Sequence, residues 1–186
     1  MRSLLMVGVL FFAVAGSAVA QDYPKGEVAG NYTYVHINLG GGAPGIDCHG
    51  GGGSAAWSLN HYLGVVGEFT GCKWTGLPSG LSAHTLTYLF GPRLTYRAYG
   101  RLEPFGEVLI GGAHAGGSAT GFGSGSANAF AMAIGGGADY KWKPSVAIRF
   151  IQADYLYTRF DLGPGAPTHQ NNFRLQAGVV YRFGGR

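Results

Sequence analysis

Near the C-terminus, over residues 172–183, side chains alternate strictly in character. One set of alternate positions is apolar or aromatic: Phe173, Leu175, Ala177, Val179, Tyr181 and Phe183. The positions between them are mostly polar or small: Asn172, Arg174, Gln176, Gly178, Val180 and Arg182. A period of two residues predicts a β-strand. The run is long enough to cross a membrane, with its apolar face toward lipid and its polar face toward the lumen of a barrel.

Seven earlier segments of the chain alternate in a similar way, which suggests one repeated structural unit. The eight predicted strands cover residues 27–36, 53–60, 62–71, 82–97, 101–114, 127–141, 145–160 and 172–183. The connections alternate in length, with long loops at 38–52, 72–81, 115–126 and 161–170 and short turns elsewhere. This pattern predicts an all-β fold, an eight-stranded antiparallel up-and-down transmembrane β-barrel, with its long loops outside the cell and its short turns in the periplasm.

Two positions interrupt the alternation within predicted strands. Pro92 lies inside the fourth segment, and because proline has no N–H to donate to a ladder, we expect a β-bulge there. In the seventh segment, Asp154 falls on the same face as Phe150. A bulge near Ile151 is therefore predicted to return Asp154 to the lumen.

The aromatic end of the last strand and the rhythm of eight strands resemble the small outer-membrane β-barrel superfamily of OmpA-like transmembrane domains. The resemblance implies a place in the outer membrane of a Gram-negative bacterium, with outer-membrane lipid around the barrel. It also implies that Phe183, with Tyr181, forms the signal read by the barrel assembly machinery. Three further residues, Gly184 to Arg186, follow Phe183.

The N-terminus has the three parts of a secretory signal peptide. These are the basic residue Arg2, an apolar run from Leu4 to about Val14, and Ala18-Val19-Ala20. We expect residues 1–20 to be removed and residues 21–186 to form one barrel domain. The formal net charge of +4 is small and scattered, and we expect no nucleic-acid partner.

Charged residues of the predicted strands fall almost entirely on the face opposite the apolar one. The predicted lumen charges are Glu68, Arg93, Arg97, Glu107, Asp139, Lys141, Arg149, Asp154, Arg174 and Arg182. The interior of an eight-stranded barrel is just wide enough for side chains, and unpaired charges there are costly. We therefore expect ion pairs, for example Glu107 with Arg93 or Arg149. Two interpretations remain open at this point, a structural filling of the lumen and a gated conduit or proton path.

The two cysteines, Cys48 and Cys72, occur in a chain predicted to be secreted. A disulfide is the expected state in an oxidising compartment, and it would close a loop of about 25 residues. The alternative is a metal site that adds Asp47 and His49 as ligands. The spacing of the cysteines does not match a paired zinc-binding motif, so we expect no metal site.

No family-specific catalytic motif is present, and we expect neither an enzyme nor a cofactor. His114 with Ser118 or Ser124, near Glu107, is the nearest approach to a nucleophile with its base. The Gly-rich segments 50–53 and 115–126 lack the Lys-Ser/Thr pair of a phosphate-binding loop and read as flexible loops.

The leading hypothesis is a barrel scaffold with a plugged lumen, whose four loops contact a molecule outside the cell that the sequence does not identify. The first alternative is a narrow conduit or a barrel that binds a small ligand, because several lumen positions carry glycine or alanine, for example Gly64, Ala131, Gly135 and Gly178. The second alternative is an outer-membrane enzyme that modifies lipid.

Overall fold

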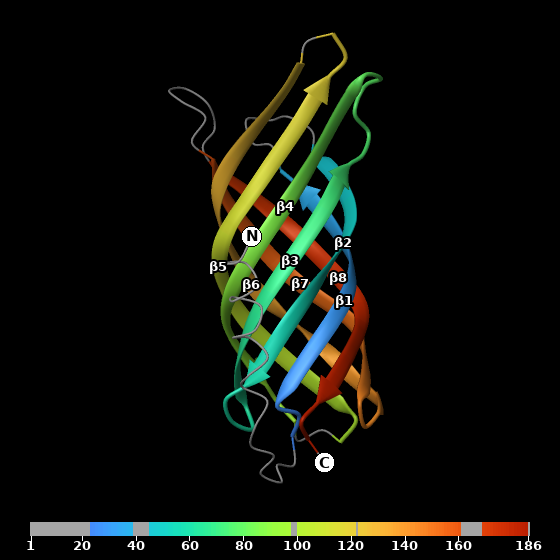
Figure 1. Ribbon diagram of the computed structural model, residues 1–186, viewed down its shortest axis with the longest axis vertical. Coiled ribbons are helices and arrows are strands. Elements are labelled where there is room, and N and C mark those ends of the chain that lie inside the picture. Colours follow the sequence, from blue (N-terminus) through green and yellow to red (C-terminus); the bar gives the residue numbers. More distant parts are fainter. Residues whose placement is uncertain (1–22, 39–44, 98–99, 122, 161–168, 186) are drawn as a thin grey trace, which may run out of the picture.

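The strands close into a single barrel (Figure 1). The computed structural model describes residues 23–38, 45–97, 100–121, 123–160 and 169–185. The eight strands are β1 (Gly26–Ile37), β2 (Ile46–Ser58), β3 (Leu63–Trp74), β4 (Leu81–Thr95), β5 (Leu102–Ala119), β6 (Gly123–Lys143), β7 (Val146–Phe160) and β8 (His169–Phe183). Each strand pairs antiparallel with the next, and β8 pairs antiparallel with β1. The predicted fold class is confirmed.

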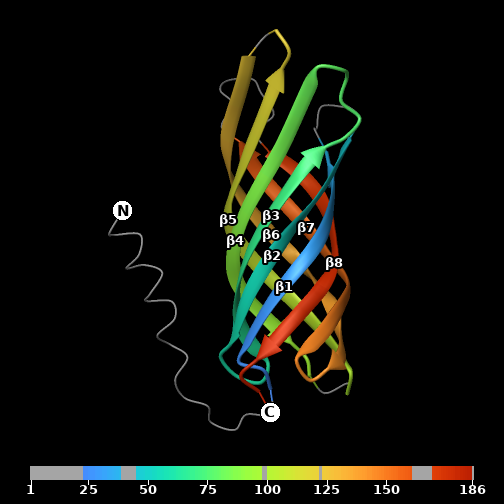
Figure 2. The same cartoon turned by 45° about the vertical axis from the view of Figure 1, so that its right-hand side comes forward.

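The two ends of the barrel differ in their connections (Figure 2). At one end, called here the turn end, the short connections 59–62, 96–101 and 144–145 join neighbouring strands, β1 begins and β8 ends. The other end, called here the loop end, carries the connections β1–β2, β3–β4, β5–β6 and β7–β8. The predicted signal peptide, residues 1–20, lies outside the described residues. Among the described residues, no helix is long and apolar enough to cross a membrane.

The polarity of the barrel is inverted relative to a soluble protein. Large apolar side chains are exposed on the outer face, for example Phe90 at 60% and Leu94 at 62%, whereas Arg149 and Arg174 are at most 1% exposed in the interior. Such a distribution suits a barrel whose outer face contacts lipid. The alternation of burial along each strand matches the predicted inward and outward faces.

The two predicted irregularities have different outcomes. In β7, Ile151 pairs with Ala138 and Arg149 with Asp139, so Phe150 is an extra residue, and Asp154 is buried inside. This bulge is confirmed. The bulge predicted at Pro92 is wrong, because Phe90 pairs with Ile110 and Arg93 with Glu107 in one unchanged register. The chain passes Pro92 without an extra residue.

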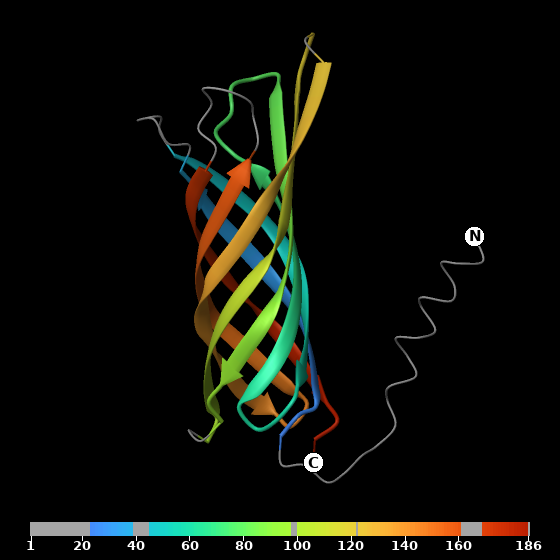
Figure 3. The same ribbon diagram turned by 90° about the vertical axis from the view of Figure 1, so that its left-hand side faces the viewer.

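The predicted long loops are shorter than expected, because strands extend into their Gly-rich parts. Residues 46–52, predicted as loop, belong to β2, and most of the predicted loop 115–126 forms the outer part of the β5–β6 hairpin. That hairpin projects beyond the other strands (Figure 3). Glycine is needed at Gly50, where a Cβ atom would overlap with the carbonyl oxygen of Gly71 on the neighbouring strand. Here glycine permits close approach of two strands, and it does not mark a loop.

Candidate functional site

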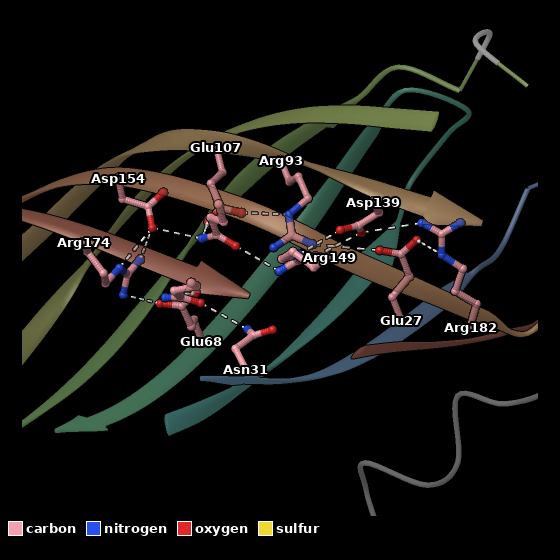
Figure 4. Close-up of polar contacts among 12 residues, drawn as sticks. Glu27, Asn31, Glu68, Arg93, Glu107, Asp139, Arg149, Asp154, Arg174 and Arg182 are labelled. Atoms are coloured by element: carbon pink, nitrogen blue, oxygen red, sulfur yellow. Dashed lines mark hydrogen bonds and ion pairs between the residues drawn. The ribbon is translucent and has the colours of Figure 1, made fainter. Parts of the chain in front are cut away.

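The candidate site is the charged interior of the barrel (Figure 4). Within the described residues, six carboxylates and six cations face inward, so their formal charges balance. They are Glu27, Glu68, Glu103, Glu107, Asp139 and Asp154, with Arg93, Arg97, Lys141, Arg149, Arg174 and Arg182. Every strand except β2 contributes at least one of them. Because the alternation places these side chains inward, the same pattern that turns apolar groups to lipid concentrates charge in the lumen.

The part of the network nearest the loop end is centred on Arg174. Its guanidinium pairs with Glu68 and with Asp154, the latter at 2.8 Å between Nη2 and Oδ2. Arg174 lies on β8 and Glu68 on β3, which are not neighbouring strands, so this ion pair crosses the lumen. Gln176 adds a hydrogen bond from Nε2 to Glu68 at 3.3 Å and accepts one from Asn31 at 3.1 Å. These contacts join β8 to β1 at the seam and to β3 across the lumen.

Gln152 links this group to the middle of the barrel. Its amide nitrogen donates to Asp154 at 3.0 Å and to Glu107 at 2.8 Å, and its amide oxygen accepts from Arg149 at 2.9 Å. Glu107 also accepts from Nε of Arg93 at 2.7 Å. Gln152 is fully buried, and each of its amide groups has a partner. A buried polar group stabilises a fold only when it is satisfied in this way.

A buried aromatic ring lies against both guanidinium groups at this level. The guanidinium carbon of Arg93 lies 4.6 Å from the ring centroid of Phe105, and that of Arg149 lies 4.5 Å from it. Phe105 is only 6% exposed, although it is aromatic and its strand faces lipid on the other side. Contact with an aromatic face is favourable for a desolvated cation. The ring therefore fills the lumen and also stabilises both arginines.

The part nearest the turn end is centred on Arg182. It pairs with Glu103 at 2.7 Å, Glu27 at 3.3 Å and Asp139 at 3.5 Å. Asp139 is shared with Arg149, whose Nε lies 2.8 Å from Oδ1. The remaining contacts at this level are Lys141 with Glu103 at 2.9 Å, Arg97 with Glu27 at 3.8 Å and Arg93 with Glu27 at 3.9 Å. The contacts thus connect both halves of the network through Arg93 and Arg149.

The structure brings the predicted lumen charges together and adds residues that the sequence analysis omitted. Glu27 and Glu103 complete the charge balance, and Gln152 and Phe105 connect and fill the network. The two acids stand on the inward face of predicted strands, so their parity was a usable signal. The one signal for Phe105 in the alternation is its place on β5, where it shares a face with Glu103 and Glu107.

Cys48 and Cys72 are joined by a disulfide, with 5.6 Å between their Cα atoms. Both side chains face the lumen near the loop end, and Cys48 is fully buried. Asp47 and His49 lie on the outer face of β2, where Asp47 accepts hydrogen bonds from Tyr34 at 2.8 Å and lies 2.8 Å from Nδ1 of His36. The alternative metal site with Cys48, Asp47 and His49 is not assembled, because successive residues of a strand point to opposite faces.

The candidate catalytic grouping is also not assembled. His114 lies on the outer face of β5, with Nδ1 2.7 Å from the side-chain oxygen of Asn128, whereas Glu107 is inside the barrel. Ser118 hydrogen-bonds with Ser82 at 2.8 Å and is four residues further along the strand, about 13 Å from His114. Among the described residues, no group of three or more His, Cys, Asp or Glu side chains is placed to hold a metal ion.

Tyr181 and Phe183, the predicted assembly signal, lie on the outer face of β8 at the turn end. Their side chains are 57% and 42% exposed, and their ring centroids are 6.5 Å apart. The Phe183 ring occupies the space beside Gly26, where a Cβ atom would overlap with it. Both rings are thus presented beside the start of β1.

Comparisons with known proteins agree with this architecture. The family described as outer membrane protein beta-barrel domain matches residues 4–183. A crystal structure of Neisserial surface protein A superposes with a TM-score of 0.69 at 15% identity, covering 88% of this chain and 100% of that one. The attachment invasion locus protein Ail of Yersinia pestis gives a TM-score of 0.60 at 19% identity, covering 87% of this chain and 99% of that one.

No curated protein sequence matches the chain. The likeness to the two solved structures establishes the fold, and the family match covers nearly the whole chain. The chain belongs to the outer-membrane protein β-barrel family, and its place is the bacterial outer membrane.

Proposed function

We propose that this protein is a closed barrel scaffold of the outer membrane, with a plugged lumen, that presents the connections of its loop end at the cell surface. The observation that carries the proposal is the balanced network of six carboxylates and six cations across the lumen. Ion pairs such as Arg174 with Glu68 join strands that are not neighbours in the barrel. A conducting path would have to displace these buried contacts, each of which is costly to break.

The glycines that favoured a conduit in the sequence support the closed reading instead. A Cβ atom at Gly135 would overlap with the carbonyl oxygen of Ala153, and one at Gly178 would overlap with that of Gly30. The backbone of the neighbouring strand fills the space that a side chain would take at each of these positions. The missing side chains therefore do not leave a channel. Between Phe105 and the loop end, large side chains, including Leu89 and Leu109, fill the lumen.

A surface-interaction role fits the shape of the loop end. The β5–β6 hairpin extends outward as paired strands, so it presents an ordered surface and not a free coil (Figure 3). The similar proteins are described as a surface protein and as an attachment invasion locus protein. We propose a role of the same general kind for this chain, in which the loop end contacts a molecule outside the cell.

Single-channel conductance and liposome swelling of the refolded protein test the plug. Folding is verified first by the shift of the electrophoretic band on heating. We expect no steady conductance from the native protein and steady conductance from the double variant Arg93→Ala with Glu107→Ala, which removes a buried ion pair of 2.7 Å without changing net charge. The matched control is Arg101→Ala, at an exposed turn residue. Steady conductance of the native barrel would refute the plug and favour a conduit.

Surface display is tested on intact cells with an epitope inserted between Pro78 and Ser79, in the β3–β4 connection. The control places the same epitope between Pro144 and Ser145, in the β6–β7 turn. Antibody should label intact cells only for the first insertion and should label both after permeabilisation. The opposite result would place the turn end outside and overturn the proposed orientation.

A further inference from the structure

A cavity of about 190 Å³ lies inside the barrel at its loop end. Arg174 borders it on the side of the charge network, and Cys72 and Trp74 contribute to its wall. The aliphatic side chains of Val35, Ile37 and Leu156 also line it. The cavity therefore begins where the ion pairs end.

The cavity exists because the inward side chains at this level are short. Ala115 and Ala127, which face each other on β5 and β6, and Thr70, Thr85 and Thr87 replace the bulky residues found deeper in the barrel. An eight-stranded barrel has an interior that large side chains just fill. Where alanine and threonine occupy these positions on several strands together, a space of molecular size remains.

The charges beside the cavity disfavour an ionic ligand. Arg174 lines the space, and its guanidinium is engaged by Glu68 and Asp154. These three groups together carry one net negative charge, which opposes an anion. A cation in the cavity would instead face the guanidinium of Arg174 first. A neutral ligand avoids both costs.

Of the threonine hydroxyls that line the cavity, that of Thr87 has no side-chain partner among the described residues. Thr87 is 5% exposed and lines the cavity, and within the described residues its hydroxyl makes no side-chain hydrogen bond. The neighbouring hydroxyl of Thr85 differs, because it accepts a hydrogen bond from the indole N–H of Trp74 at 2.9 Å. Thr87 therefore offers both a donor and an acceptor to a group that enters the cavity.

We infer that this cavity binds a small neutral ring compound that carries one hydroxyl group, of about the size of phenol. An apolar cavity of about 150 Å³ holds one benzene molecule, and about 190 Å³ leaves room for one or two further heavy atoms. The aliphatic wall and Trp74 contact the ring. The ligand hydroxyl pairs with Thr87. This site goes beyond the scaffold role, since a plugged barrel needs no ligand.

The test is ¹⁹F NMR titration of the refolded protein with 4-fluorophenol, corrected for partition into protein-free micelles. We expect saturable binding to the native protein. Ala127→Phe, which fills the cavity, should abolish it, whereas Ala55→Phe, the same change on the exposed outer face, should leave it unchanged. Absence of saturable binding to the native barrel, or equal binding to Ala127→Phe, would overturn the inference.

Two further measurements keep the inference testable if Ala127→Phe fails to fold. Thr87→Val keeps the size of the side chain and removes its hydroxyl, so it should weaken 4-fluorophenol binding about fivefold and leave fluorobenzene binding unchanged. Equal weakening of both compounds would contradict the role of Thr87. The ions 4-fluorobenzoate and 4-fluorobenzylammonium should bind at least about tenfold more weakly than 4-fluorophenol, and comparable binding of either would contradict a site for neutral ligands.

Discussion

Replacement of Arg174 by methionine is the most direct test of the charge network. Arg174 is fully buried and pairs with Glu68 and Asp154, which are 2% and 1% exposed. Methionine retains much of the aliphatic volume but leaves two carboxylates inside the barrel without their cation. Removal of one partner from a buried ion pair costs about 3–5 kcal/mol of the free energy of unfolding.

Protonation of a carboxylate left without its cation relieves this cost. The destabilisation caused by Arg174→Met therefore depends on pH. A carboxyl group with an ordinary pKa near 4 requires about 4 kcal/mol to protonate at pH 7 and about 1.4 kcal/mol at pH 5. The free energy of protonation at pH 7 is of the same size as the expected destabilisation. The loss caused by Arg174→Met should therefore shrink by about 2 kcal/mol or more when the pH is lowered from 7 to 5.

The assay is equilibrium unfolding in urea of the barrel in lipid vesicles, followed by tryptophan fluorescence and by the heat-dependent band shift. The triple variant Glu68→Gln, Asp154→Asn and Arg174→Met removes all three charges and should recover at least half of the loss. Arg101→Met is the matched control at an exposed position, with an expected change within about 0.5 kcal/mol. A loss below about 1 kcal/mol for Arg174→Met, or no recovery in the triple variant, would refute the reasoning.

Two other predictions concern covalent and backbone restraints. Replacing both Cys48 and Cys72 by alanine should lower the free energy of unfolding by roughly 3 kcal/mol, since the bridge spans 24 positions of sequence; an equal urea midpoint for this variant and the oxidised native protein would contradict it. Gly135→Ala should lower the free energy of unfolding by about 1–3 kcal/mol, because its Cβ atom would overlap with the carbonyl oxygen of Ala153. The control is Gly125→Ala, whose Cβ atom meets no atom within 4 Å and which should change the free energy of unfolding by less than about 0.5 kcal/mol. Equal losses for the two glycine variants in urea unfolding would show that close strand approach is not the cause.

The faces of the strands were predictable because each side chain reports its own environment. Phe90 and Arg93 differ in polarity and fall on opposite faces, and the closed barrel follows once eight such strands are counted. Even the bulge beside Ile151 was detectable, since one residue on the wrong face requires one extra residue in the strand.

The extent of the strands was not predictable where glycine dominates. Residues 46–52 and 115–126 carry few side chains that alternate, so period and propensity both indicate a loop. What makes Gly50 part of a strand is the backbone of Gly71 on its neighbour, and that contact is tertiary. The same limit applies to the cavity, whose volume depends on short residues contributed by several strands at one level.

The pairing of charges was predictable in kind but not in detail. Glu107 with Arg93 follows from their neighbouring strands. Arg174 with Glu68 depends on which positions face each other across the lumen, and that is fixed by the tilt and stagger of the strands. Alternation along one strand carries no information on either quantity.

The place of Arg174 and Arg182 on the last strand has a consequence for the order of assembly. Arg174 meets Glu68 over a separation of 106 residues, and Gln176 meets Asn31 over 145. The entropy cost of closing a loop increases with its length, so contacts over such long stretches of chain are the most costly to form. Until β8 joins β1, Glu68 lacks the guanidinium of Arg174, Glu27 and Glu103 lack that of Arg182, and both edge strands retain free backbone groups. Completion of the seam removes the unpaired charge and the unpaired backbone in one step, so compatibility with the lipid interior is a property of the finished ring and of no smaller part of it.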